Sequence, residues 1–132
     1  MPDEPPELPP ESPAGPQLRT VAMPRDANAG GRIFGGWTLS QMDLAGGSLA
    51  SDRCEGRVVT VAIEAMRFLR PVEVGDEVSC FCTLEREGDT SMVVRIETWA
   101  RGRGHGRHPE KVTEGVFTYV ALDDDGKPRA FE

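Results

Sequence analysis

The sequence predicts an α+β protein in which a curved antiparallel sheet wraps around one long buried helix. Residues 37–50 are almost all small or apolar, which is typical of a helix that is covered on most sides rather than amphipathic. The later segments alternate between apolar and polar residues as strands do. Because a flat open sheet alone cannot cover such a helix, we expect the sheet to curve around it.

The first 16 residues differ in composition from the rest of the chain. They hold seven of the eleven prolines, four acidic residues and no basic residue, which is the composition of a disordered extension. The remaining residues, 17–132, suit one domain with a sizeable core. The chain has neither a signal-peptide pattern nor a stretch long and apolar enough to span a bilayer, so we expect a cytoplasmic protein that does not bind membranes.

Charge and cysteine content exclude several classes of partner and site. The net charge is −7, but removing the four acids of the tail from the 22 acids leaves 18 against 15 basic residues. This balance argues against a nucleic-acid partner, which requires a broad basic face. Cys54, Cys80 and Cys82 are expected to be small core residues of a reduced protein, and their spacing does not suit a zinc site.

The elements follow in the order strand, helix and four strands. The segment 57–68 is rich in β-branched residues on both of its faces, as in a central strand that is covered on both sides. A turn at 87–89 joins two alternating segments into an antiparallel hairpin, and the last strand ends at the turn-forming residues 123–126. The expected strands are 17–23, 57–68, 77–85, 92–99 and 111–121.

One acidic residue, Asp43, stands inside the apolar helix. Gly46 and Gly47 lie three and four positions further on, where helix neighbours stack over one another. Two interpretations stay open. In the first, the glycines leave a bare wall along which a ligand approaches the carboxylate; in the second, they only allow close packing of helix and sheet, while Asp43 bonds a neighbouring backbone group.

Gly35 and Gly36 open the helix and leave its first backbone N–H groups uncovered. Free donors and the helix dipole together suit a developing negative charge. The glycines are not a phosphate-binding loop, because the required Lys and Ser or Thr are missing, and no dinucleotide-binding pattern is present.

Several separated motifs resemble the YciA-type acyl-CoA thioesterases of the hot-dog fold. They agree with that family in order and spacing and cover nearly everything after the tail. The stretches that carry the resemblance are 24–45, 56–62, 68–72, 74–76 and 126–130.

The resemblance implies an enzyme of lipid metabolism that hydrolyses acyl-CoA to a free acid and coenzyme A. It implies that Asp43 is the catalytic carboxylate, that Asn28 faces the thioester and that an N–H group of Gly35 or Gly36 forms the oxyanion site. Asp43 acts either as a general base toward water or as a nucleophile. We expect no metal and no cofactor other than the coenzyme A of the substrate.

The resemblance also implies a homodimer, with sheets joined edge to edge, and a hexamer of three such dimers. Seven residues separate Gly36 from Asp43, or about 10 Å along a helix at 1.5 Å per residue. An aspartate side chain is too short to bridge that gap. We therefore expect each site to combine Asp43 of one chain with Asn28, Gly35 and Gly36 of the other.

Basic residues are candidates for holding the phosphates of coenzyme A, because clustered Arg suits such anions. For the segment 101–111, a hairpin connection kept soluble by its charge is an equal alternative. The candidate residues are Arg57, Arg67, Arg70, Arg101, Arg103 and Arg107.

Two other functions remain as alternatives. A hot-dog hydratase would place a His in its site, and here both histidines, His105 and His108, fall in the Gly/Arg-rich segment. A non-catalytic acyl-CoA sensor that regulates transcription would need an added DNA-binding domain, which the tail cannot supply.

Overall fold

The computed structural model describes residues 8–10, 15–103 and 107–132. The predicted order of one strand, one long helix and four strands is confirmed. Most of the predicted tail, residues 1–7 and 11–14, lies outside the described residues. The elements are β1 (Leu18–Val21), the short 3-10 helix η1 (Pro24–Asp26), α1 (Gly35–Cys54), β2 (Val58–Phe68), β3 (Glu77–Glu87), β4 (Ser91–Arg101) and β5 (Glu110–Ala121).

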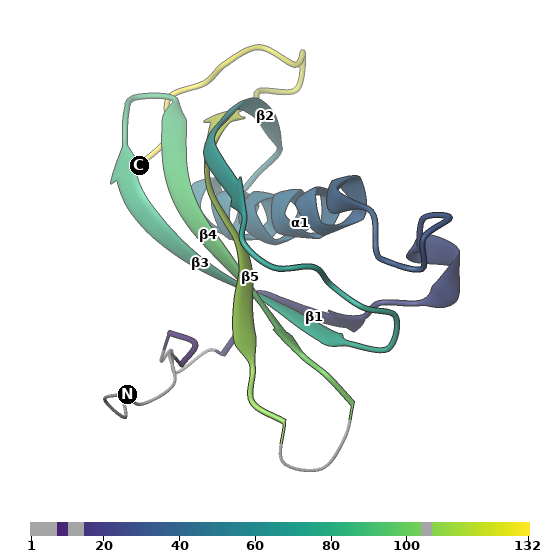
Figure 1. The fold of residues 1–132 in the computed structure, drawn as a ribbon. Coiled ribbons are helices and arrows are strands. Elements are labelled where there is room, and N and C mark those ends of the chain that lie inside the picture. The colour runs from purple at the N-terminus through teal and green to yellow at the C-terminus, as the bar shows by residue number, and fades with distance from the viewer. Residues whose placement is uncertain (1–7, 11–14, 104–106) are drawn as a thin grey trace.

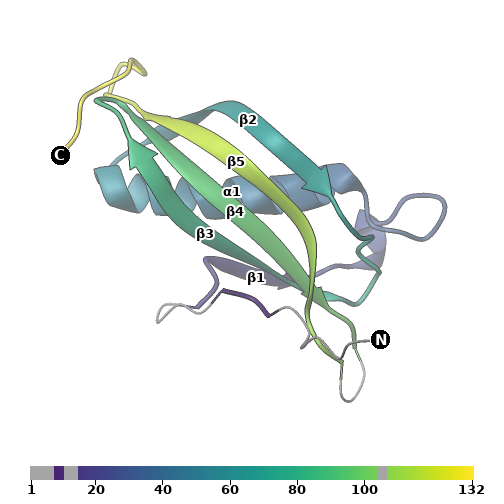
Figure 2. The same cartoon turned by 60° about the vertical axis from the view of Figure 1, so that its left-hand side comes forward.

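All five strands form one sheet in the order β1-β3-β4-β5-β2, and every pairing is antiparallel. The sheet curves, and α1 lies along its inner face (Figure 1). The view turned by 60° shows the same helix crossing behind the strands (Figure 2). The predicted α+β architecture, a curved sheet around one helix, is therefore confirmed.

The core lies between α1 and the inner face of the sheet. Met42, Ala45, Ala50 and Cys54 of the helix face buried residues of β3, β4 and β5. Cys54 and Cys80 are buried, and Cys82 is partly buried against the same cluster, so all three cysteines pack as predicted. The strand residues of this core are Cys80, Met92, Val94, Ile96, Phe117, Tyr119 and Ala121.

The prediction that 57–68 is a central strand is wrong for the single chain. β2 lies at the edge of the sheet, and Val59, Val61 and Ile63 remain 42%, 55% and 37% exposed. Burial of the helix is also less complete than predicted, since Leu44 is 62% exposed. Apolar residues on both faces of the strand need other residues packed against them, and a single chain covers only some of them.

Among the described residues, no helix is long and apolar enough to cross a membrane.

Candidate active site

The start of α1 is open to an incoming group. Gly35 and Gly36 are exposed, and the preceding Phe34 makes no side-chain cap bond to the helix. The N–H groups of Trp37 and Thr38 already bond to the carbonyl of Phe34. Within the described residues, the first two N–H groups of the helix bond to no backbone carbonyl outside it, as expected at an uncapped N-terminus. The predicted donors are thus free, at the positive end of the helix dipole.

Asn28 lies in the loop that leads into this helix start. Its Oδ1 accepts hydrogen bonds from the N–H groups of Gly30, at 2.9 Å, and Arg32, at 3.1 Å. Both partners are donors, so the side-chain orientation is defined and the amide NH2 points away from the turn. The loop is fixed to the helix start through Phe34, the residue before α1, whose N–H bonds the carbonyl of Asp26. Asn28 is exposed, so its amide can donate to a group outside the chain.

Asp43 is held on one side only. Its Oδ1 accepts a hydrogen bond from Thr60 Oγ1 at 2.7 Å and another from Tyr119 Oη at 3.0 Å. The Tyr119 hydroxyl also lies 3.1 Å from the carbonyl oxygen of Asp43. No described residue donates to Oδ2. The carboxylate thus has one oxygen anchored by two hydroxyls and one oxygen available for chemistry.

Of the two interpretations of Gly46 and Gly47, the bare wall beside Asp43 is wrong at Gly46. A Cβ built on Gly46 would overlap Tyr119 Oη and lie 2.7 Å from Cδ1 of Ile96. A Cβ on Gly47 would make only an ordinary contact, at 3.7 Å from Tyr119 Cε1. The aromatic side chain fills the space, so close packing of helix and sheet is the correct interpretation of Gly46. Tyr119 therefore closes the Gly46 side of the carboxylate to a ligand.

The two halves of the predicted site lie apart within one chain. Gly36 and Asp43 belong to the same continuous helix, so their backbones are about 10 Å apart along its axis. The structure brings Gly35 and Gly36 together with the Asn28 loop, and it brings Asp43 together with Thr60 and Tyr119. A single chain therefore contains both components, but it does not bring them into contact.

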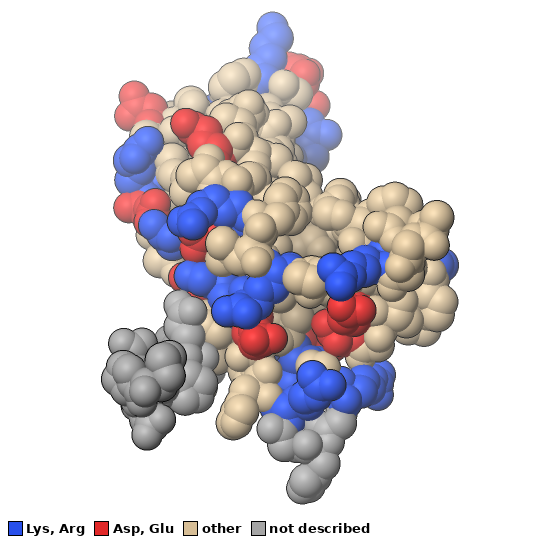
Figure 3. All heavy atoms as spheres, in the orientation of Figure 1, with Lys and Arg blue, Asp and Glu red and all other residues tan. Residues whose placement is uncertain are grey.

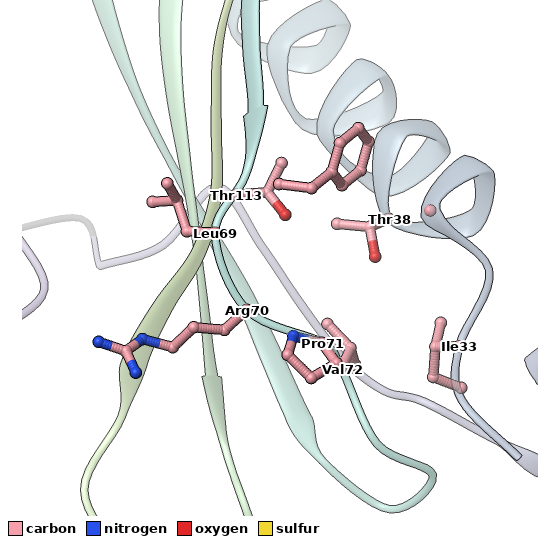
Figure 4. A pocket seen from close by; sticks show the side chains of 9 residues that line it. Ile33, Thr38, Leu69, Arg70, Pro71, Val72 and Thr113 are labelled. Carbon is pink, nitrogen blue, oxygen red and sulfur yellow. The ribbon is translucent and has the colours of Figure 1, made fainter.

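A cavity of about 330 Å³ opens beside Gly35. Its walls are largely apolar, and Figure 4 shows Thr38 and Thr113 among the side chains that line it. Both threonines are almost completely buried. The guanidinium of Arg70 points away from Ile33 and Thr38 (Figure 4). The cavity thus lies next to the free donors of the helix start and provides room for part of a substrate.

The six candidate arginines do not form one cluster. Arg57 lies just before the start of β2 and donates to the carbonyl of Asp123 at 2.8 Å. Arg67 and Arg70 lie at the other end of that strand. Acidic and basic side chains are mixed on the face shown in Figure 3. The remaining pairings are Arg67 with Glu114 at 3.4 Å, Arg70 with Glu110 at 3.5 Å, Arg101 with Glu77 at 3.0 Å and Arg103 with the Gly75 carbonyl at 3.0 Å.

Arg70 and Arg107 line a second depression, which also contains His108. Arg70 and Pro71 border both this depression and the cavity at the helix start, so the two lie next to each other. His105 lies outside the described residues, and His108 does not line the cavity beside Gly35.

Thr60 and Tyr119 are the site residues that the sequence did not predict. They are direct partners in the β2–β5 ladder, and Val61, which follows Thr60, is displaced by an irregularity of that ladder. Such bulges often re-aim side chains next to active sites. The signal in the sequence is a hydroxyl residue in each of two strands, and it becomes specific only once the register is known.

A family model described as the thioesterase superfamily matches residues 30–106. The acyl-CoA thioester hydrolase YciA of Escherichia coli strain K12 is 51% identical over 115 residues, which are 86% of this chain and 87% of that protein.

Solved structures give the same similarity in three dimensions. The hexameric thioesterase y2039 of Yersinia pestis shares 47% identity at a TM-score of 0.84, over 92% of this chain and 99% of that one. Cj0915, a hexameric hotdog fold thioesterase of Campylobacter jejuni, shares 39% identity at a TM-score of 0.86, over 89% and 90% of the two chains.

Proposed function

Because the chain belongs to the thioesterase superfamily, we propose that it hydrolyses acyl-CoA thioesters to a free acid and coenzyme A. The name of the Escherichia coli relative supports this substrate class. The observation that carries the proposal is the pair of components on α1: free N–H groups at its start and an Asp43 carboxylate anchored through one oxygen. Thioester hydrolysis needs an oxyanion site and a base or nucleophile.

The proposed reaction places the thioester oxygen on the N–H groups of Gly35 and Gly36, with the Asn28 amide as a further donor. The free Oδ2 of Asp43 then has two possible routes. As a base, it takes a proton from water while the water oxygen attacks the carbonyl carbon; as a nucleophile, it attacks that carbon itself and water cleaves the resulting anhydride. In both routes the C–S bond breaks and the sulfur leaves as coenzyme A. The chain's own groups supply each step without a further cofactor.

We propose that two chains complete each site, so that Asp43 of one protomer faces the helix start of its partner. The solved relatives of Yersinia pestis and Campylobacter jejuni are hexameric, which supports a hexamer here. The exposed residues Val59, Val61 and Ile63 of edge strand β2, with Leu44 beside Asp43, provide an apolar surface for the partner. Pairing two such edges removes the exposed strand edge. Three of these dimers make the proposed hexamer.

We propose that the coenzyme A phosphates bind at the end of the sheet where Arg70 and Arg107 line the second depression, with Arg101 and Arg103 on the adjacent hairpin. This depression shares Arg70 and Pro71 with the cavity at Gly35, so one extended substrate can reach both. Free cysteines support a reducing, cytoplasmic location for the enzyme.

A panel of acyl-CoA esters, read by the release of a free thiol, tests the function. We expect turnover by the wild-type protein and a loss of at least about a hundred-fold in Asp43→Asn, which is the lower range for removing a general base. The variant should stay folded by circular dichroism and should still bind coenzyme A. Asp52→Asn, which changes an exposed acid on the same helix, is the matched control and should keep full activity.

Other outcomes would support the rival functions. Binding of acyl-CoA without any release of thiol would indicate a sensor, and hydration of an enoyl thioester, followed by its absorbance, would indicate a hydratase. More than a tenth of wild-type activity in Asp43→Asn would remove Asp43 from the mechanism.

A further inference from the structure

We propose that Tyr119 is a positioning residue for the catalytic carboxylate and that Gly46 exists to let its hydroxyl reach Asp43. This inference rests on the proposed thioesterase function, since it concerns how the reacting oxygen of Asp43 is presented. Tyr119 is only 1% exposed, so it does not touch the substrate. It acts through the carboxylate that it contacts.

The geometry of the hydrogen bonds separates the two carboxylate oxygens. The Tyr119 hydroxyl carries one proton. Its oxygen, Oη, lies 3.0 Å from Oδ1 and 3.1 Å from the main-chain carbonyl oxygen of Asp43. Together with Thr60 at 2.7 Å, it fixes the plane of the carboxyl group from two directions. A carboxylate held by one donor alone could rotate about its Cβ–Cγ bond, because that torsion is broad. With two donors on Oδ1, Oδ2 is kept in one direction.

The tyrosine ring is itself held in place. Its neighbour on the same face of β5, Phe117, stacks against it with ring centroids 6.4 Å apart and planes at 13°. Burial and the adjacent Asp43 raise the pKa of Tyr119, so the hydroxyl keeps its proton and remains a donor. A rigid aromatic ring with a polar tip is well suited to this task, because it brings a donor to the helix without introducing a charge.

Gly46 is the second half of the arrangement. Any side chain at this position would occupy the place of Tyr119 Oη, whereas Gly47 has room for a Cβ. The two adjacent glycines therefore have different roles, and only Gly46 is required by the hydrogen bond to Asp43. The hydrogen bond from Tyr119 to Asp43 thus explains why position 46 must be glycine, whereas position 47 need not be.

Kinetics of Tyr119→Phe are the main test, because the substitution removes the hydroxyl and keeps the ring. We expect kcat to fall about ten- to a hundred-fold, as for a reacting group displaced by a fraction of an ångström to 1 Å, while KM changes less than two-fold. Gly46→Ala should reproduce this pattern, and combining both changes should add little to either alone. Gly47→Ala is the matched control and should retain wild-type kcat.

A second measurement does not depend on activity. Crystal structures of Tyr119→Phe and Gly46→Ala should show the Asp43 carboxylate in more than one orientation, or rotated from its position in the wild-type protein. A single unchanged orientation in both variants would overturn the positioning role, as would a kcat within three-fold of wild type in Tyr119→Phe. Loss of activity in Asp43→Asn together with full kcat in Tyr119→Phe would refute this inference and leave the proposed function intact.

Discussion

Two cysteine thiols on β3 pack in the core beside α1, and their reactivity bears on any assay that detects free coenzyme A. Burial raises the pKa of Cys80 to about 11 and, with Cys80 as its neighbour, the pKa of Cys82 to about 12. At pH 8 only about one in a thousand molecules carries a Cys80 thiolate, and fewer carry the Cys82 thiolate. The thiol is the form that persists in the folded protein.

We therefore expect Cys80 and Cys82 of the native protein to react with a disulfide reagent at pH 8 at least about a hundred-fold more slowly than in guanidinium, because the thiolate is the attacking species. Mass spectrometry of labelled peptides measures each position separately. The unfolded protein is the control, in which both thiols should react fully. Rapid labelling of Cys82 in the folded state would contradict its burial.

Among single residues, Asp43 was predictable because a lone acid in an apolar helix stands out within a short window. Thr60 and Tyr119 were not, since they lie 17 and 76 residues from Asp43 and hydroxyl residues are ordinary in strands. Only the register that places Thr60 opposite Tyr119 makes their hydroxyls meet at one oxygen. The spacing from Asp43 singles out Gly46 in the sequence, but the atom that fills its space comes from a distant strand.

At the level of elements, α1 ends at a residue in the left-handed conformation. Glu55 has φ 54° and ψ 48°, and its N–H bonds the carbonyl of Ser51. An L-residue other than glycine pays about 1–2 kcal/mol for this conformation. Arg129 supports the same helix end from the C-terminal segment, by donating to the carbonyl of Cys54 at 2.7 Å.

Replacing Glu55 by Gly should therefore stabilise the protein, with the free energy of unfolding rising by about 0.5–1 kcal/mol. Asp52→Gly, inside the last turns of the helix, is the control and should lower it by a similar amount. Denaturant unfolding at one fixed protein concentration measures both, since oligomers gain stability with concentration. A loss of stability in Glu55→Gly would show that the glutamate side chain itself stabilises the protein by more than the backbone strain costs.

The strands illustrate why element type was easier to predict than element position. Alternation identified the hairpin of β3 and β4 within a few residues, because that signal is local. The sequence does not predict that β2 lies at the edge of the sheet. Apolar residues on both faces of 57–68 indicate that both faces must be covered, but they do not indicate which molecule covers them. Its exposed residues Val59, Val61 and Ile63 mark where the single chain is incomplete.

For the molecule as a whole, the length of the rigid helix α1 decides whether one chain can form the proposed site alone. Seven residues between Gly36 and Asp43 fix their backbones about 10 Å apart in one chain, while a general base must come within about 3 Å of the group it serves. In the proposed dimer, a second helix running antiparallel across a two-fold axis would bring its Asp43 to the first helix's start. The same operation would bring the first chain's Asp43 to the second helix's start, so each of the proposed dimers would have two sites.

Complementation between inactive variants tests this arrangement. Asn28→Ala and Asp43→Ala should each be nearly inactive, because each damages every site of its own homodimer. When the two are refolded together in equal amounts, half of the dimers are mixed if pairing is random. A mixed dimer has one site with both residues intact and one site with both removed. About a quarter of all sites should therefore recover activity.

Mixing fully folded variants without exchange of chains is the control, and native mass spectrometry confirms both the mixed dimers and their assembly into hexamers. Recovery requires that the Asp43 of one chain and the Asn28 of the other meet, since neither variant supplies both. If Asn28 and Asp43 of the same chain formed a site, every site in a mixed dimer would still lack one of them. Activity no higher than that of the better single variant, with mixed dimers present, would therefore place both residues in one chain or exclude Asn28 from the reaction.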